Sequence, residues 1–108
     1  MNEDVGAVFA ALADATRRTM LHELVREGST TVPALTAMLP ISRQAVAKHL
    51  SQLSAAGLVR GRREGRETRY TVTPAPLEDA VAWIVQTGSE WDDRLARLGS
   101  YVSPDGAG

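Results

Sequence analysis

The chain has 108 residues, 44% of them hydrophobic, and a formal net charge of −1. This length and composition suit one domain with a modest core. The chain contains no cysteine, which excludes disulfides, thiolate metal sites and thiol redox sensors. It also lacks the run of roughly 18 apolar residues that spans a bilayer. Its acidic N-terminus does not resemble a secretory signal, so we expect a cytoplasmic protein without membrane contact.

Charge is distributed unevenly along the chain. Residues 1–40 carry three arginines against five acidic residues, and residues 71–108 carry two arginines against six. Residues 41–70, in contrast, carry seven basic residues against two acidic ones. A basic segment inside an acidic chain is typical of a surface that meets phosphate. The middle third of the chain therefore predicts contact with nucleic acid.

Two helices are expected in the first 27 residues. In residues 4–13, apolar side chains recur at helical spacing, and this stripe faces either the core or a partner subunit. Asp14 is a suitable N-cap for a second helix over about residues 15–27. Arg17 and Arg18 lie at the unfavourable end of its dipole, so they are expected to be solvated or to pair with acids elsewhere. The side chains expected to bury this helix are Met20, Leu21, Leu24 and Val25.

A helix-turn-helix pattern leads into the basic segment. A short helix begins at Thr31 and is stopped by Pro40, because the residue before a proline is pushed out of helical geometry. The stretch 42–59 predicts a second helix, capped by Ser42 and closed by Gly57. Long polar side chains on its first two turns suit insertion into a DNA major groove, and a solvated helix face is the alternative. These outward residues are Arg43, Gln44, Ala47 and Lys48.

After Gly57 the pattern changes from helical to alternating. Residues 58–63 and 68–72 predict two short strands, and Gly65 supplies the positive φ that a tight hairpin turn requires. A basic hairpin after a helix-turn-helix is typical of a wing that contacts the DNA backbone or the minor groove. The alternative is an exposed edge hairpin charged only for solubility. The arginines of this hairpin are Arg60, Arg62, Arg63, Arg66 and Arg69.

A last helix is expected over about residues 77–98, after a break at Pro74 and Pro76. Its apolar positions alternate between spacings of four and three, which favours packing against another helix along the whole length. A domain this small has little left to bury these apolar side chains, so we expect a second copy of the chain to pack on them. We favour one helix, bent at Gly88, over a break there, because a helical glycine costs only about 1 kcal/mol. The positions of this seam are Leu77, Val81, Ile84, Gly88, Trp91, Leu95 and Leu98.

The segments 9–18 (FAALADATRR) and 49–59 (HLSQLSAAGLV), followed by 63–66 (REGR) and Tyr70, resemble the ArsR/SmtB family of bacterial winged-helix repressors. The resemblance implies a mainly α fold with a small β-hairpin, comprising about five helices and a two-stranded wing. It implies a homodimer joined through the first and last helices, which binds an imperfect inverted repeat at a promoter and blocks transcription. We expect residues 1–102 to form this single domain and residues 103–108 to be a disordered tail.

The resemblance and the basic pattern together name the expected contact residues. Ala47 departs from a common serine of the family, so one polar contact is expected to be missing, and His49 is expected to be packed or to touch a phosphate. The expected DNA-binding residues are Ser42, Arg43, Gln44, Ala47, Lys48, His49, Arg62, Arg63, Arg66 and Arg69. The expected dimer-interface residues are Val5, Phe9, Leu77, Val81, Ile84, Trp91, Leu95 and Leu98.

Metal-sensing members of that family use a cysteine pair on the third helix, or histidine and acidic residues on the last helix, and both sets are missing here. We therefore expect no metal site and no cofactor. The chain resembles the cysteine-free branch, whose signals are small molecules, partner proteins or still unidentified. Catalysis is not expected, because His22 and His49 lie on different helices and no nucleophile or phosphate-loop motif occurs. The main alternative is a winged-helix module for protein interaction without an operator, against which the basic wing argues.

Overall fold

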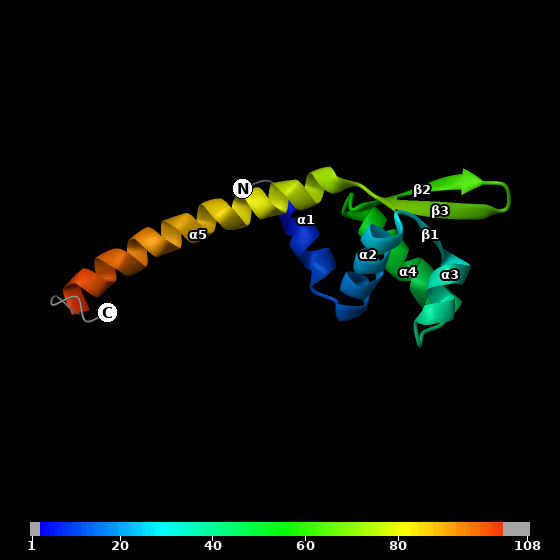
Figure 1. Ribbon diagram of the computed structural model, residues 1–108, viewed down its shortest axis with the longest axis horizontal. Helices are drawn as coiled ribbons and strands as arrows, with labels where there is room; N and C mark the ends of the chain where they lie inside the picture. The colour runs from blue at the N-terminus through cyan, green and yellow to red at the C-terminus, as the bar shows by residue number, and fades with distance from the viewer. Residues whose placement is uncertain (1–2, 103–108) are drawn as a thin grey trace.

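The computed structural model describes residues 3–102, and within them five α-helices and three strands follow in the order α1, α2, β1, α3, α4, β2, β3, α5. Helices α2, α3 and α4 pack beside the sheet, while α5 extends away from this body as a long rod (Figure 1). The predicted fold class, a mainly α winged helix-turn-helix, is thereby confirmed. Residues 103–108, expected to be a disordered tail, lie outside the described residues.

Helices α3 (Val32–Met38) and α4 (Arg43–Ala55) form the predicted helix-turn-helix. Each begins with a side-chain cap of the expected kind. The Thr31 hydroxyl accepts a hydrogen bond from the backbone N–H of Ala34 at 3.2 Å. The Ser42 hydroxyl accepts one from the N–H of Ala45 at 3.1 Å. Such caps satisfy donors that the helix itself leaves unpaired and are worth about 1 kcal/mol each.

The C-terminal end of α4 is closed by Gly57, as predicted. Gly57 has φ 77°, its N–H donates to the Ser54 carbonyl at 2.9 Å, and the Leu58 N–H donates to the Leu53 carbonyl at 3.0 Å. This pair of bonds is the Schellman motif, whose left-handed residue favours glycine. The motif turns the chain directly from α4 into the next strand.

The sheet has three antiparallel strands rather than the two that we predicted. β2 (Val59–Glu64) and β3 (Glu67–Val72) form the hairpin, with Gly65 at φ 62° in its turn. β1 (Thr30–Thr31) pairs with the other edge of β3, giving the order β1-β3-β2. Two residues are too few to produce an alternating pattern, so this strand left no signal in the sequence. Its pairing fixes the base of the hairpin to the start of α3.

Helices α1 (Glu3–Leu12) and α2 (Ala15–Glu27) close the core, with Asp14 as the N-cap of α2, as expected. The core includes Met20, Leu21 and Leu24 of α2 together with the inward residues of α4. Val25 corrects our prediction, because it is 62% exposed rather than buried. It lies at an apolar cavity of about 620 Å³ between α2, β3 and the start of α5.

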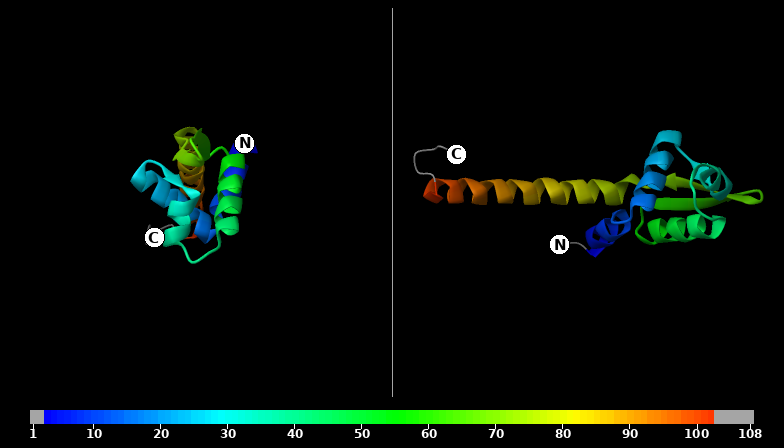
Figure 2. Two further views of the ribbon diagram at one scale, coloured as in Figure 1. Left: turned by 90° about the vertical axis from the view of Figure 1, so that its right-hand side faces the viewer. Right: turned by 90° about the horizontal axis from the view of Figure 1, so that it is seen from below.

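Helix α5 (Pro74–Val102) begins three residues earlier than expected. Pro74 and Pro76 do not break the chain before the helix but form its first turn, where no backbone donor is needed. The helix continues through Gly88, as we favoured. Only its beginning lies on the body, and the rest projects from it in Figure 1 and in the right-hand view of Figure 2. None of the helices described in residues 3–102 combines the length and apolar composition that crossing a bilayer requires.

The apolar stripe of α1 faces its own chain. Val5 is 3% exposed and Val8 is fully buried, and α1 packs along α5, with the rings of Phe9 and Trp83 meeting edge to face at 5.4 Å. The expected contribution of Val5 to a dimer interface therefore needs correction, since intramolecular packing leaves almost none of its surface for a partner. Phe9 is half-buried and keeps part of its surface.

Candidate nucleic-acid interface

The first two turns of α4 present polar side chains to solvent, as predicted. Arg43, Gln44, Ala47 and Lys48 are all exposed, while the opposite side of the helix is held in the core by Val46, Leu50 and Leu53. The Ser42 hydroxyl accepts the capping bond that orients the start of the helix, and its expected DNA contact stays a prediction. Ala47 has no hydrogen-bonding side chain, unlike its longer neighbours on this exposed face of α4. This arrangement suits a helix whose N-terminal turns enter a major groove.

The hairpin lies beside this face and extends it. Arg43 of α4 and Arg66 of the hairpin turn line one small cavity, of about 210 Å³. A second cavity, of about 530 Å³, separates α4 from the hairpin and is lined by Ala47, Ser51 and Tyr70, among others. Two basic side chains from segments 23 residues apart in the sequence numbering thus reach the same surface. Such grouping is what phosphate contacts near a base-reading helix require.

The register of the hairpin divides its arginines between two faces. Arg62 pairs with Arg69 and Arg63 pairs with Thr68, so neighbouring residues alternate between faces. Arg62, Arg63 and Arg66 are all exposed. Arg63 Nε donates to the Gly65 carbonyl at 3.1 Å, which stiffens the turn. The hairpin therefore offers cations along its edge and tip, on both faces.

Arg69 differs from the other predicted DNA-binding arginines. Its Nε lies 3.2 Å from Glu64 Oε2, and its Nη1 donates to the Ser29 hydroxyl at 3.0 Å. Two intramolecular partners orient this guanidinium toward the α2–β1 connection and leave it less free to contact a phosphate. These contacts fix the hairpin on the body, and the expected DNA contact of Arg69 stays a prediction.

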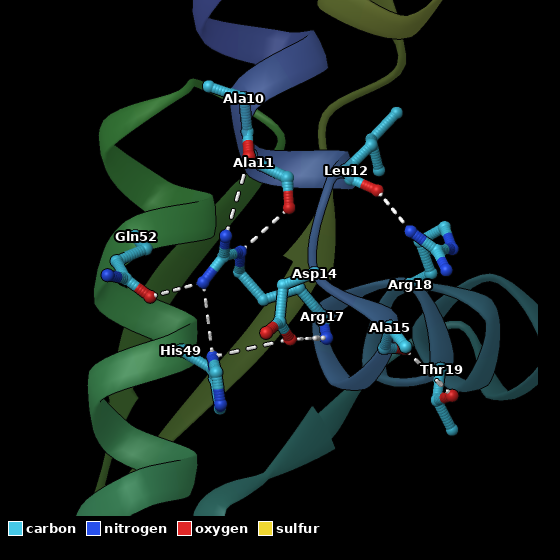
Figure 3. Close-up of polar contacts among 10 residues, drawn as sticks. All are labelled: Ala10, Ala11, Leu12, Asp14, Ala15, Arg17, Arg18, Thr19, His49 and Gln52. Atoms are coloured by element: carbon cyan, nitrogen blue, oxygen red, sulfur yellow. Dashed lines mark hydrogen bonds and ion pairs between the residues drawn. The ribbon is translucent and has the colours of Figure 1, made fainter.

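His49 lies on the flank of α4, away from Arg43 and Gln44. Its side chain is 20% exposed, and its Nδ1 lies 4.0 Å from Asp14 Oδ2 and 3.4 Å from Arg17 Nη1 (Figure 3). These contacts suit the packed role, one of the two that we expected. The pKa of the Asp14 carboxyl is lowered from its usual 3.8, first because it accepts a hydrogen bond from the Arg17 N–H and further because the Arg17 and His49 side chains lie nearby.

Comparison with known proteins agrees with this geometry. A family described as "Helix-turn-helix domain" matches residues 12–62. An uncharacterized HTH-type transcriptional regulator of Bacillus subtilis, YuzN, is 41% identical over 91 residues, which cover 78% of this chain and 99% of that protein. The structure of an ArsR-like transcriptional regulator from Rhodococcus sp. RHA1 is 42% identical and superposes with a TM-score of 0.80 over 93% of both chains. The chain belongs to the ArsR family of helix-turn-helix transcriptional regulators.

The ArsR-family assignment explains why a base-reading helix and a wing occur together, and it does not favour the alternative of an interaction module without DNA. The winged helix-turn-helix domain of Mb0332 from Mycobacterium bovis, described as homodimeric, is 26% identical with a TM-score of 0.62, covering 88% of this chain and 84% of that one. The protein is thus a DNA-binding transcriptional regulator. Within residues 3–102 of this ArsR-family chain, no three histidine or acidic side chains gather where they could hold a metal ion.

One group beside the interface was not predicted in this ArsR-family chain. Arg17 of α2 hydrogen bonds to Ala10 and Ala11 of α1 and to Gln52 of α4. Its position at the unfavourable end of the α2 dipole was the available signal that its side chain has other partners. The sequence did not indicate which partners these were, since Arg17 and Gln52 are separated by 35 residues.

Proposed function

We propose that this regulator is a homodimeric repressor that binds an imperfect inverted repeat at a promoter. The observation that carries the proposal is the grouping of Arg43, Gln44 and Lys48 on the exposed, capped start of α4, with Arg66 of the hairpin beside Arg43. Arginine pairs bidentately with guanine and glutamine with adenine, whereas lysine neutralises phosphate. The proposal therefore assigns base reading to Arg43 and Gln44 and backbone contact to Lys48.

The proposed phosphate contacts also come from the hairpin. Arg62, Arg63 and Arg66 are exposed and densely spaced, which suits a flexible set of cations along a DNA backbone better than a set of base readers. The whole chain has a net charge of −1, so attraction to DNA must come from this local surface. Affinity should for that reason fall steeply as salt rises.

The proposed dimer contact is the free part of α5. Val81, Ile84, Trp91, Leu95 and Leu98 are each more than half exposed, although they follow one seam of the helix. Apolar side chains of this size in a continuous stripe are rarely left in water. An antiparallel or crossed partner helix would bury them and relate two α4 helices by a two-fold axis, about one DNA turn or roughly 34 Å apart.

Repression would follow from occupancy, because a dimer that covers both half-sites of a promoter excludes the polymerase. The signal that releases it is proposed to be a small molecule or a partner protein, since the chain has no thiolate to sense soft metal ions.

The test is selection of binding sites from random DNA, followed by gel shifts of the enriched sequence at two salt concentrations. We expect an enriched inverted repeat, bound more tightly than scrambled DNA at both. The absence of any enriched motif, or equal binding to all DNA, would instead support the interaction module.

A further inference from the structure

We infer that Arg17 is a positioning residue that fixes the base-reading helix α4 to α1, and so sets the spacing of the two α4 helices in the dimer. The inference rests on the proposed function, because it concerns a dimer that reads two half-sites. Arg17 does not face the proposed DNA surface. Its side chain leaves the first turn of α2 and enters the space between α1 and α4 (Figure 3).

The contacts of Arg17 reach two other helices at once. Its Nε donates to the Ala11 carbonyl at 2.7 Å and its Nη2 to the Ala10 carbonyl at 3.4 Å. Its Nη1 donates to Gln52 Oε1 of α4 at 2.6 Å and lies 3.4 Å from His49 Nδ1. One planar guanidinium therefore joins the C-terminal end of α1 to the flank of α4, and the backbone of Arg17 itself belongs to α2.

These acceptors suit a cation for a physical reason. The last carbonyls of a helix have no partner within the helix and carry the negative end of its dipole. Ala10 and Ala11 belong to the last turn of α1, so a guanidinium there is held by charge as well as by hydrogen bonds. Hydrogen bonds of this charge-assisted kind are roughly twice as strong as neutral ones.

α1 and α4 both contribute to the hydrophobic core, but neither is the main packing partner of the other. α1 packs chiefly on α5 and α2, and α4 packs chiefly on α3, α2 and β2. Between α1 and α4 lies a cavity of about 310 Å³, lined mostly by alanine side chains. The alanines of this lining are Ala7, Ala10, Ala11, Ala55 and Ala56. Arg17 and Gln52, the other lining residues, are the pair that crosses the gap.

The consequence concerns the whole assembly. α1 packs along α5, and α5 carries the proposed dimer seam, so any tilt of α4 relative to α1 changes the distance between the two α4 helices of a dimer. Selectivity for the spacing of half-sites depends on that distance. Removing the Arg17–Gln52 hydrogen bond should therefore weaken the selectivity for the spacing between half-sites. It removes no side chain that is proposed to touch DNA.

The chain offers matched variants. Arg18 Nη1 donates to the Leu12 carbonyl at 2.6 Å, so Arg18→Ala removes a cap from the same end of α1 but no link to α4. Gln52→Ala removes the link at an exposed position of α4 and leaves the α1 cap intact. Gln52→Glu keeps an acceptor for the guanidinium. Because Arg17→Ala removes both functions and could unfold the protein, Gln52→Ala is the deciding variant.

The first measurement needs no DNA. The chain lacks cysteine, so Ser51→Cys provides a single site for a nitroxide label on α4, at an exposed position whose neighbours do not include Arg17. Pulsed electron spin resonance on the dimer then gives the distribution of distances between the two labels. We expect Arg17→Ala and Gln52→Ala to broaden or shift this distribution, and Arg18→Ala and Gln52→Glu to leave it as in the unsubstituted background.

The second measurement compares binding to the selected operator with binding to the same operator lengthened by two base pairs, which rotates one half-site by roughly 70°. We expect Gln52→Ala to reduce the ratio of these affinities about tenfold, the effect of losing one charge-assisted hydrogen bond.

Unchanged label distances and an unchanged ratio in Gln52→Ala would overturn the inference. Equal effects of Arg18→Ala would also overturn it, because capping of α1 would then be the cause. If the dimer forms but selects no operator, the proposed function fails, and the label distances still decide the role of Arg17.

Discussion

Gln44 is the second residue of α4 and the side chain whose proposed role is most specific. It is exposed, and the Ser42 cap directs the turn that carries it outward. Replacing Gln44 with Ala should relax the preference at one base pair of each half-site, because a bidentate pair with adenine contributes about 1–3 kcal/mol of discrimination. The measurement is the selected sequence logo of each protein.

Ser54→Ala is the matched control for Gln44, because Ser54 is also exposed on α4 but lies in its last turns. Its logo should equal that of the wild type. A Gln44→Ala logo that also equals the wild type would remove the base-reading role from this residue.

The Asp14 carboxyl is expected to make the stability of the fold depend on pH. The carboxyl of Asp14 caps α2, and its pKa is lowered from 3.8 chiefly by the hydrogen bond from the Arg17 N–H. A pKa that is lower in the folded than in the unfolded state means that the carboxylate stabilises the fold above 3.8 and loses this effect as pH falls through the folded value. Asp14→Asn keeps an acceptor for the cap but carries no charge.

Urea unfolding of both proteins across a pH series measures the effect of Asp14. The stability advantage of wild type over Asp14→Asn should be present at neutral pH and should shrink below 3.8. An advantage that stays constant down to the acid end of the series would show that charge at Asp14 has no part in it.

At the scale of elements, the hairpin is expected to contribute affinity without sequence information. Arg62, Arg63 and Arg66 are exposed, whereas Arg69 is bound by Glu64 and Ser29. Replacing the three exposed arginines with alanine should lower the slope of log affinity against log salt by about 0.9 for each phosphate that is no longer neutralised. Gel shifts over a range of salt concentrations measure this slope, and the base preferences of the logo should remain.

The control for removing a single positive charge is Arg97→Ala, an exposed residue near the C-terminal end of α5. Arg66→Ala should change the salt slope and Arg97→Ala should not. If all three hairpin substitutions together keep the wild-type slope, the hairpin is no phosphate-binding wing.

At the scale of the whole molecule, operator binding is expected to depend on the α5 seam. Ile84 is 53% and Trp91 is 57% exposed in the single chain. An aspartate at either position would therefore be solvated in the monomer and should not unfold it. In a dimer the same aspartate would be a buried, unpaired charge, which costs about 3–5 kcal/mol. Ile84→Asp or Trp91→Asp should therefore yield folded monomers that no longer hold the full operator, as sedimentation and gel shifts would measure.

Gln86→Asp introduces the same charge on α5 outside the seam and should leave both dimer and binding unchanged. A seam variant that sediments as a monomer yet binds the full operator as tightly as wild type would contradict the dimer mechanism.

The chain as a whole is expected to be independent of metals. It has no cysteine, and its two histidines, His22 and His49, lie on different helices. Neither can complete a tetrahedral zinc site without several carboxylates gathered around it. Titration of zinc, nickel, cadmium or arsenite against the DNA complex should release no DNA at low micromolar concentrations. Stoichiometric release by any of them would reveal a site assembled across the dimer.

The parts of the fold that the sequence predicted are those whose causes are local. Ser42 and Gly57 mark the ends of α4 because a cap needs only the residues of its own turn. Gly65 marks the hairpin because only a positive φ closes so short a turn there. The exposed face of α4 and the seam of α5 follow from helical period alone, and the family resemblance supplied their order and expected partners.

The tertiary structure decided what depends on residues far apart in the chain. β1 exists only because β3 pairs with it, and Val25 stays exposed because α5 leaves a cavity beside it instead of covering it. Arg69 contacts Glu64 and Ser29, one of them 40 residues away. Arg17 acquires its role from carbonyls of α1 and an amide of α4. Local sequence propensity does not predict such contacts, because they stabilise the fold only after distant segments of the chain have been brought together.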